Sequence, residues 1–436
     1  MMRRTVGAAL LALAVAAPAT ADTTSSPGPE PTELGGTPVV GGSAGQPTQL
    51  VAGLWSDTLV GPGEDPANTR WFSYTRAMAQ SRVFVGVVAS AVDPVNDQIR
   101  VEVRSSDGEA CGSYDDSTAS SAPGVLMGAL KVVGLENDDP ACLSSPELRI
   151  AVSRGSTSGL ASSMPFALRV VEEPPLPSDD DSEPPADHFL QTLATDEAAP
   201  TAGARSFDDA PSVDGTVRDQ VPQGTERLWK VHLDWGQALA WRLQVPSRPE
   251  SETSTPDPQV EVTLFDPMRN AFDGGAVDAE TSGSYGFDGA DLSDTTAPIA
   301  DAQLSGDAAL VPGDYWVAVS VATSPTDDAP IEVPIELTVG ATGEKTGAPD
   351  FPDAVTGPGG RVGPAGYDKS TPFLVGDGVF SADVSGTPTS PDDEAAADPD
   401  VRRIAGFAVG AASLVSLLAG VVLLRRRARF SRAAAR

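Results

Sequence analysis

Short runs of apolar residues that alternate with polar ones, separated by turn residues, fill the chain from about residue 39 to residue 340. A period of two is typical of strands that bury one face, and no amphipathic stretch of helical length lies between the runs. The runs of the first half are 54–60, 71–74, 83–89, 99–104, 125–133, 148–152 and 166–171. Their number and spacing predict an all-β sandwich or barrel and argue against an α/β fold.

The most regular stretch, residues 226–245, predicts a β-hairpin with its turn at 234–237. A version of the same stretch occurs earlier, at residues 69–88. Comparison of the two makes Trp71 and Trp229 equivalent, and we expect both side chains in a core. A hairpin that occurs twice suggests a domain that occurs twice.

Four segments of the first half recur in the same order in the second half. The pairs are 53–74 with 212–233, 99–108 with 260–270, 147–153 with 314–320, and 165–172 with 334–340. A retained order at nearly constant spacing indicates a tandem duplication. We therefore expect two β-sandwich domains, at 39–172 and 206–340, joined by an acidic, proline-rich linker at 173–205.

The two ends of the chain predict export and a membrane anchor. Residues 1–21 have a basic start, an apolar run and a small-residue ending, which describe a cleavable signal peptide, and a flexible lead-in follows at 22–38. Residues 404–424 carry no charge and are long enough to cross a bilayer as one helix. The arginine-rich tail at 425–436 predicts a cytoplasmic C-terminus, so we expect a single-pass plasma-membrane protein with its N-terminus outside.

Residues 341–403 are rich in Gly, Pro, Ala and Asp and predict a stalk between the second domain and the membrane. Extended like polyproline, such a stalk would reach about 190 Å. One apolar island, at 371–384, interrupts it. There we expect an edge strand or a docking segment.

All 61 acidic residues but only 19 of the 29 basic ones lie between residues 22 and 401, so the exported part has a formal charge of −42. A surface this acidic repels nucleic acid and anionic lipid headgroups, and no basic stripe offsets it. We therefore expect no nucleic-acid partner. Solubility is the simplest explanation of the charge, and calcium or a basic partner are the alternatives.

Cys111 and Cys142 are the only cysteines. An even count in an exported protein predicts one disulfide bond within the first domain. Closing a loop of about 30 residues should stabilise the fold by roughly 3 to 4 kcal/mol. The sequence has no CxxC motif and no Cys/His set, which argues against zinc and thiol redox chemistry.

The sequence contains no HExxH or P-loop motif. His188 lies in the acidic linker, and His232 lies on the polar face of its predicted strand, where a solvent-facing position is the simplest explanation. We therefore predict no enzymatic activity and no resident cofactor. A cell-surface hydrolase that uses two carboxylates stays open as an alternative, because a pair among the 61 acidic residues can be neither excluded nor located from the sequence.

Two further groups of residues are candidates for binding. A Gly/Asp-rich loop at 273–300 offers weak calcium ligands without the EF-hand spacing, namely Asp273, Asp278, Asp288, Asp291 and Asp294. The turn near 234–237 offers a binding surface made of Asp234, Trp235, Gln237 and Trp241. We expect Trp229 and Trp316 to pack in strands, which leaves Trp235 and Trp241 as the exposed tryptophans. Wall-glycan binding through them is a second alternative.

The segments 236–245, 260–270 and 310–321 (GQALAWRLQV, VEVTLFDPMRN and LVPGDYWVAVSV) resemble the bacterial pre-peptidase C-terminal (PPC) domain. The resemblance rests on Phe265-Asp266-Pro267 before a turn and on the phrase from Pro312 to Tyr315 before a late strand. It covers the second domain directly and the first through the repeat. It implies jelly-roll-like sandwiches with an accessory role, and no peptidase domain accompanies them. The whole layout is similar to membrane-anchored surface proteins of GC-rich Gram-positive bacteria.

Together these patterns predict a membrane-anchored extracytoplasmic binding or scaffolding protein without catalytic activity of its own. The expected partner is a protein at the cell surface, such as another membrane-anchored protein.

Overall fold

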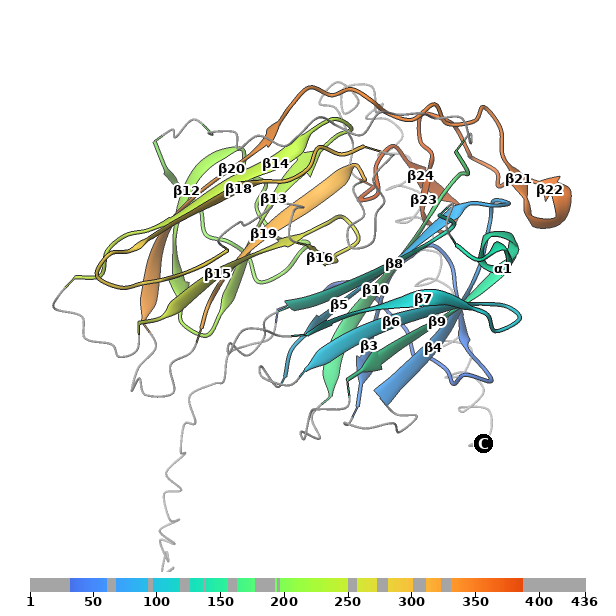
Figure 1. Ribbon diagram of the computed structural model, residues 1–436, viewed down its shortest axis with the longest axis horizontal. Helices are drawn as coiled ribbons and strands as arrows, with labels where there is room; N and C mark the ends of the chain where they lie inside the picture. The colour runs from blue at the N-terminus through green and yellow to red at the C-terminus, as the bar shows by residue number, and fades with distance from the viewer. Residues whose placement is uncertain are drawn as a thin grey trace, which may run out of the picture.

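The computed structural model describes residues 32–60, 68–92, 97–117, 126–135, 138–155, 163–176, 193, 197–249, 257–272, 281–300, 311–322 and 331–386. Nearly all their regular structure is β, in two sandwiches that lie side by side (Figure 1). The predicted all-β fold with two sandwiches is confirmed. The predicted signal peptide, span and tail lie outside the described residues. Among those that are described, no helix has the length and apolar character to cross a membrane.

The first sandwich consists of two facing sheets. One holds β1 (Thr37–Pro38), β3 (Gly53–Leu59), β10 (Met164–Glu173), β5 (Arg82–Ser90) and β8 (Leu126–Val133), in that spatial order. The other holds β2 (Thr48–Leu50), β4 (Thr69–Thr75), β9 (Glu147–Arg154), β6 (Gln98–Ser105) and β7 (Ala110–Ser117). Residues that alternate inward from both sheets, such as Phe72, Val85 and Val101, form its buried core.

The second sandwich repeats this arrangement. One sheet holds β11 (Ala199–Pro200), β12 (Gly215–Pro222), β20 (Glu332–Thr342), β14 (Ala238–Val245) and β18 (Ala290–Thr295). The other holds β13 (Glu226–Leu233), β19 (Gly313–Val321), β15 (Gln259–Phe265) and β16 (Ala271–Phe272), with β17 (Ser282–Ser284) also paired to β15. The stretch 273–300, predicted as a loop, thus contains β17 and β18.

Both sandwiches have the same topology. In each sandwich the eight main strands can be numbered along the chain, from β3 in the first and from β12 in the second, leaving out β17. One sheet then holds the first, eighth, third and sixth strands, side by side in that order. The other sheet holds the second, seventh, fourth and fifth strands. This is the strand order of a jelly roll, and its occurrence in both halves supports the tandem duplication.

The stretch 226–245 does not form a hairpin. β13 pairs with β19, whereas β14 pairs with β18 and β20 in the opposite sheet, so the turn at 234–237 carries the chain across the sandwich. β4 and β5 are separated in the same way. The hairpin prediction was wrong because alternation and a tight turn look the same at a hairpin and at a corner between two sheets.

The expected equivalence of Trp71 and Trp229 is wrong by one residue. In the second sandwich Trp229 pairs with Val317. Ile150 occupies the position of Val317 in the first sandwich, and it pairs with Phe72. Phe72 and Trp229 both lie in the cores, and Trp71 therefore points to the outer face of its sheet. A slip of one residue in a strand alignment exchanges the buried and the outer face.

The second sandwich begins earlier than the expected boundary at residue 206. Its strand β11 pairs with β12, and the Gly203 N–H donates to Asp219 Oδ2 at 2.9 Å. Gly41 makes the same bond to Asp57 in the first sandwich, at 2.8 Å. Residues 197–205 therefore belong to the second sandwich and not to the linker.

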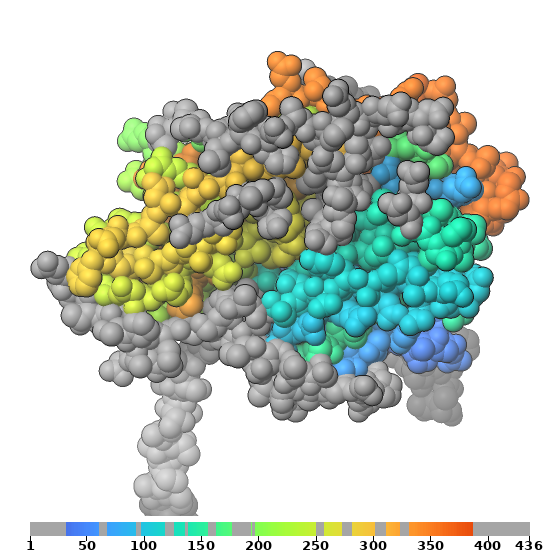
Figure 2. Space-filling model, in the orientation of Figure 1, coloured from blue at the N-terminus to red at the C-terminus, as the bar shows by residue number. Residues whose placement is uncertain are grey.

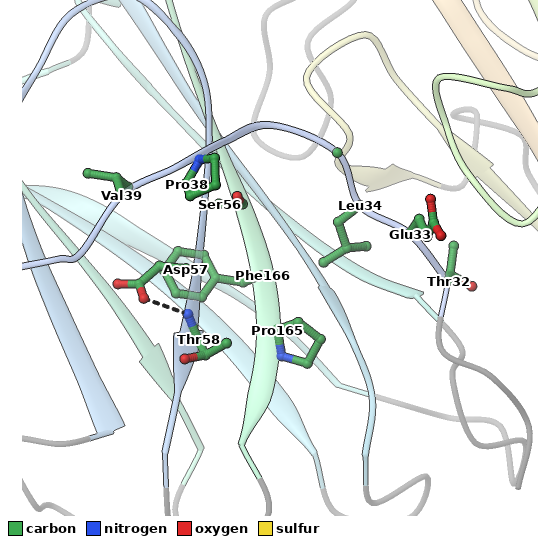
Figure 3. A pocket seen from close by; sticks show the side chains of 11 residues that line it. Thr32, Glu33, Leu34, Pro38, Val39, Ser56, Asp57, Thr58, Pro165 and Phe166 are labelled. Atoms are coloured by element: carbon green, nitrogen blue, oxygen red, sulfur yellow. Dashed lines mark hydrogen bonds between the residues drawn. The ribbon is translucent and has the colours of Figure 1, made fainter. Parts of the chain in front are cut away.

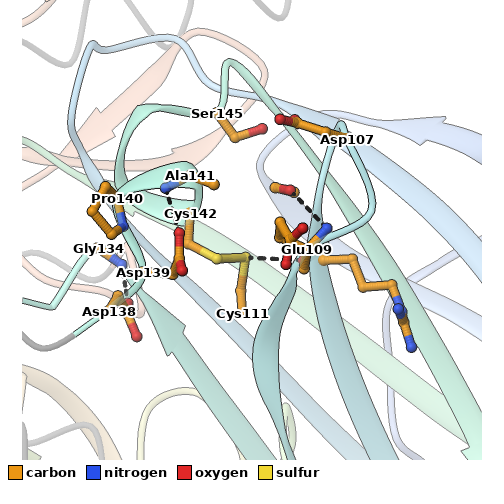
Figure 4. The surroundings of a disulfide bond; sticks show 12 residues. Asp107, Glu109, Cys111, Gly134, Asp138, Asp139, Pro140, Ala141, Cys142 and Ser145 are labelled. Atoms are coloured by element: carbon orange, nitrogen blue, oxygen red, sulfur yellow. Dashed lines mark hydrogen bonds between the residues drawn. A yellow bond between two sulfur atoms is a disulfide. The ribbon is translucent and has the colours of Figure 1, made fainter.

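The predicted disulfide joins Cys111 on β7 to Cys142 on α1 (Pro140–Ser144), with an S–S distance of 2.06 Å (Figure 4). Asp139 caps α1 by accepting a hydrogen bond from the Ala141 N–H at 2.7 Å. The bond ties the edge strand β7 to the segment between β8 and β9. This prediction is confirmed.

The two sandwiches are joined along a face that we call the seam. The outer face of the β3–β10–β5–β8 sheet meets the outer face of the β13–β19–β15 sheet, and Figure 2 shows the two bodies in contact. One apolar cluster at the seam consists of Leu34, Val88, Leu126, Ala167, Phe207, Ala210, Leu228, Phe265, Trp316 and Ala318. A second consists of Phe84, Leu130, Val132, Val171, Met268, Val311, Phe351, Phe373 and Val384.

The turn between β15 and β16 enters the sheet of the first sandwich at two glycines. A Cβ on Gly86 would lie 2.2 Å from the Met268 carbonyl oxygen, and a Cβ on Gly128 would lie 2.4 Å from the Ala271 nitrogen. Gly86 and Gly128 lie on the paired strands β5 and β8. Only residues without a side chain leave room for another backbone to approach so closely.

Arg269 holds the tip of this turn in place. Its guanidinium donates to the Leu34 carbonyl and to Asp208 Oδ1, the latter at 2.8 Å. The guanidinium also lies 4.6 Å from the centre of the Phe207 ring. Burial lowers the pKa of Arg269, and the Asp208 carboxylate opposes that shift. A buried arginine thus connects the turn with two separate segments, one on either side of the linker.

Residues 341–386, which we call the C-terminal strap, run from β20 across the top of the seam to the first sandwich (Figure 1). The strap contains β21 (Thr356–Gly357), β22 (Arg361–Val362), β23 (Phe373–Gly376) and β24 (Val379–Ser381). β23 pairs with β10 of the first sandwich. The extended stalk predicted from composition therefore does not hold for these residues, and β23 and β24 lie in the apolar island at 371–384.

Candidate functional site

The turn at 234–237, our first candidate for a binding surface, is covered by the strap. Lys345 forms an ion pair with Asp234, and the Thr346 N–H donates to the Trp235 carbonyl at 3.0 Å. The Trp235 side chain is half-buried and packs against both the second core and the seam. These contacts give the turn a structural role in docking the strap.

The other two residues of this candidate surface also have structural roles. Gln237 closes the turn, because its side-chain oxygen accepts from the Asp234 N–H at 2.9 Å. Trp241 is only 2% exposed and lies in the core of the second sandwich, so the expectation that it is exposed is wrong. No exposed indole platform remains here, and nothing at this turn favours glycan binding.

The structure does not gather the candidate calcium ligands. Asp273 and Asp278 lie outside the described residues. The Asp291 carboxylate accepts two hydrogen bonds from the Arg242 guanidinium, at 2.8 Å to Oδ1 and 2.6 Å to Oδ2. Within the described ranges, no three His, Cys, Asp or Glu side chains are grouped so as to hold a metal ion. The remaining described candidates are Asp288, which is exposed, and Asp294, which is buried.

His232 is half-buried beneath the strap and not open to solvent as expected. Its Nδ1 lies 3.0 Å from Asp314 Oδ1, and its Nε2 lies 3.8 Å from Asp234. Burial would lower the pKa of His232, but the bond to Asp314 and the charges of Asp383, Asp314 and Asp234 outweigh it and raise the pKa. An Asp–His pair of this kind serves nucleophilic catalysis only beside a hydroxyl or thiol, and Nε2 has no hydrogen-bond partner among the described residues.

One pair of carboxylates bears on the hydrolase alternative. Glu226 and Glu261 lie in one row across β13, β19 and β15, since Ser320 between them pairs with both. Burial, together with the charge of Glu261, raises the pKa of Glu226 to about 8, and burial also raises the pKa of Glu261. Glu226 is 4% exposed, so it is covered and not presented to a substrate. The row is a feature of the seam.

An open hollow of about 520 Å³ lies at the edge of the first sandwich (Figure 3). Its lining residues come from the N-terminal segment, β1, β3 and β10: Thr32, Glu33, Leu34, Gly35, Pro38, Val39, Ser56, Asp57, Thr58, Pro165 and Phe166. Leu34, Pro38 and Pro165 give the hollow an apolar lining, and the exposed carboxylate of Glu33 adds negative charge to it. The Asp57 carboxylate is ion-paired with Arg70 at 3.3 Å. A small apolar recess of this kind fits a single anchoring side chain of a partner.

The walls of the hollow are fixed by both sandwiches. The Val39 N–H donates to the Ser56 carbonyl at 2.9 Å, and β1 pairs with β3 in parallel. The Glu33 N–H donates to the Arg205 carbonyl of the second sandwich at 2.8 Å. Residues 32–38 were predicted as part of a flexible lead-in, which is wrong for these residues.

A second hollow, of about 340 Å³, lies on the outer face of the β12–β20–β14 sheet. Arg218, Gln244, Glu336 and Pro334 line it. The Arg218 guanidinium donates to the Ala198 carbonyl at 2.7 Å. This face corresponds to the face of the first sandwich that packs at the seam, but here it carries polar side chains, and no other described strand packs on it.

No protein-family model and no curated protein matches the chain. Among solved structures, it is similar to the CUB1-EGF-CUB2 domain of human MASP-1/3, with 10% sequence identity and a TM-score of 0.17 over 65% of this chain and 99% of that chain. The N-terminal CBM22-1-CBM22-2 tandem domain of Paenibacillus barcinonensis Xyn10C gives 10% sequence identity and a TM-score of 0.19, over 67% of this chain and 92% of that chain. The plant receptor-like kinase FER gives 11% sequence identity and a TM-score of 0.19, over 70% of this chain and 90% of that chain.

TM-scores this low carry no argument about the function of this chain. The PPC resemblance likewise stays a prediction.

Proposed function

We propose that the chain is a single-pass surface protein whose exported part binds a protein partner and has no catalytic activity of its own. The signal pattern at 1–21 and the uncharged stretch at 404–424 support the location. The two fused sandwiches support a binding role, because they offer a rigid body with open faces.

The hollow in Figure 3 is the main support for a binding site on the first sandwich. Its apolar lining is preformed by hydrogen bonds to both sandwiches, so a partner does not have to order it. Glu33 beside it, on a body of charge −42, favours a partner that presents an apolar side chain next to basic residues. The site is thus proposed for a basic protein surface at the membrane.

Filling the hollow should abolish partner recovery. Thr58 is exposed at the hollow, and Thr58→Arg places a bulky cation where a basic partner must dock. We expect at least a tenfold loss of the protein recovered by cross-linking in intact cells and mass spectrometry.

Gln220 is the matched control, because it occupies the position of Thr58 in the second sandwich and is also exposed. Gln220→Arg should leave recovery unchanged. The same partner at equal yield from both variants would rule out the hollow, and no reproducible partner from the unaltered protein would rule out the proposed function.

A further inference from the structure

The C-terminal strap is bonded to both sandwiches at its far end. The Arg169 guanidinium of the first sandwich donates to the Val384 carbonyl. The Val384 N–H donates to the Pro312 carbonyl at 2.9 Å, and the Asp314 N–H donates to Ser385 Oγ at 2.6 Å, both in the second sandwich. The chain is therefore held at the seam up to residues 384 and 385.

The middle of the strap is anchored by apolar side chains and backbone pairing. Phe373 is fully buried and meets Phe351 edge to face at 6.1 Å. Leu374 pairs with Glu172 of β10, and the Ala79 N–H of the first sandwich donates to the Thr356 carbonyl at 2.7 Å. The strap is thus part of the folded body along its length.

This docking shortens the connection to the membrane. Between the last strap residue, 386, and the proposed span at 404 lie 17 residues, which reach at most about 60 Å if fully extended. As a flexible chain they would span about 23 Å on average, against about 44 Å for the 63 residues of a free stalk.

We infer that the strap holds the exported body close to the bilayer, with the seam end nearest to it, so that its partner is a membrane-proximal protein surface. This inference rests on the proposed single-pass location. The strap then has two roles, since it staples the sandwiches together and sets their distance from the membrane. A body tethered in this way lies on average about 20 Å closer to the bilayer than a body on a free stalk.

Energy transfer in liposomes tests the inference on the full chain. The two native cysteines are bonded to each other, so a cysteine introduced at Val40, which is 75% exposed, is the only reactive thiol for a donor dye. Acceptor dye is placed on lipid headgroups. Phe373→Asp should release the strap and increase the mean distance of the donor from the bilayer by about 20 Å. Val362→Asp, in the same strap but 96% exposed, should leave the distance unchanged.

Hydrogen exchange supplies a test that does not depend on a variant. In the unaltered full chain, the Leu374 and Val384 amides should exchange at least a hundredfold more slowly than those of an unstructured peptide. Unprotected amides, or equal energy transfer from the Phe373→Asp and unaltered chains, would overturn the inference. Failure of the chain to float with liposomes would instead overturn the single-pass proposal, while the exchange result would still report on the strap.

Discussion

Replacement of Gly86 by valine is expected to separate the two sandwiches and to lower the free energy of unfolding by about 3 kcal/mol or more. A Cβ at this position would lie 2.2 Å from the carbonyl oxygen of Met268, a backbone atom that cannot rotate away. Valine suits strand β5 itself, because β-branched residues favour strands, so the loss arises at the seam and not within the strand. Calorimetry should show two transitions where the unaltered protein shows one.

Gly45→Val is the matched control for this experiment. A Cβ on Gly45 would meet no atom within 4 Å, and the variant should unfold within about 0.5 kcal/mol of the unaltered protein. A Gly86→Val protein that unfolds in one transition at the original temperature would contradict the close approach at the seam.

Glu226→Gln is expected to remove a pH dependence of stability and to stabilise the protein at pH 8 by roughly 2 to 4 kcal/mol. Burial and the charge of Glu261 raise the pKa of the folded Glu226 carboxyl from 4.5 to about 8. The folded state then keeps a proton that the unfolded state releases. The contribution to stability is fully present below pH 4.5 and is lost as the pH rises toward 8. Glutamine has the same shape without the titration, although an unmatched amide reduces the gain.

Urea unfolding from pH 4 to pH 9 measures this effect as the difference between the variant and the unaltered protein. The difference should grow with pH up to about 8 and then level off. Glu332→Gln, at an exposed position on β20, is the control and should show no such trend. A difference that is constant across the range would show that Glu226 is ionised in the folded state and would contradict its burial at the seam.

Periodicity predicted the strands that have one buried face, and it missed those that do not. β3, β4, β5, β6, β8, β9 and β10 each overlap a predicted run. β7 was missed because its sequence, ACGSYDDS, alternates a few half-buried residues with exposed ones at a sheet edge. The disulfide followed from cysteine count and compartment alone. Which strands pair did not follow, because a corner between sheets and a hairpin use the same local sequence.

The two copies of the repeat differ at outward positions in a way that indicates the seam, but the sequence prediction did not include it. Arg149 and Arg104 lie on the open outer face of the first sandwich, and their counterparts in the second are Trp316 and Phe265. Aromatic residues at outward positions in one copy and arginines in the other indicate that only one of the two faces is covered. A correct register was needed for this comparison, and the alignment through Trp71 did not supply it.

The hollow and most of the strap were not predicted, for a different reason. Only the apolar island at 371–384 was expected as an edge strand or docking segment, and it contains β23 and β24. The strap has the Gly, Pro and Asp composition of a flexible stalk, and its order comes from a few apolar side chains such as Phe351 and Phe373 that bury in the seam. The hollow is built from segments that meet only after both sandwiches have folded. Local sequence carries no signal for contacts made between such distant parts of a chain.

Small-angle X-ray scattering of residues 22–386, which hold both sandwiches and the strap, tests most directly whether these parts form one body. A single compact body of this length should have a radius of gyration of about 20 to 24 Å. Two separate sandwiches on an extended linker, with a free stalk, would give a value above about 30 Å. A value in the first range supports the fused ectodomain, and a value in the second would contradict it.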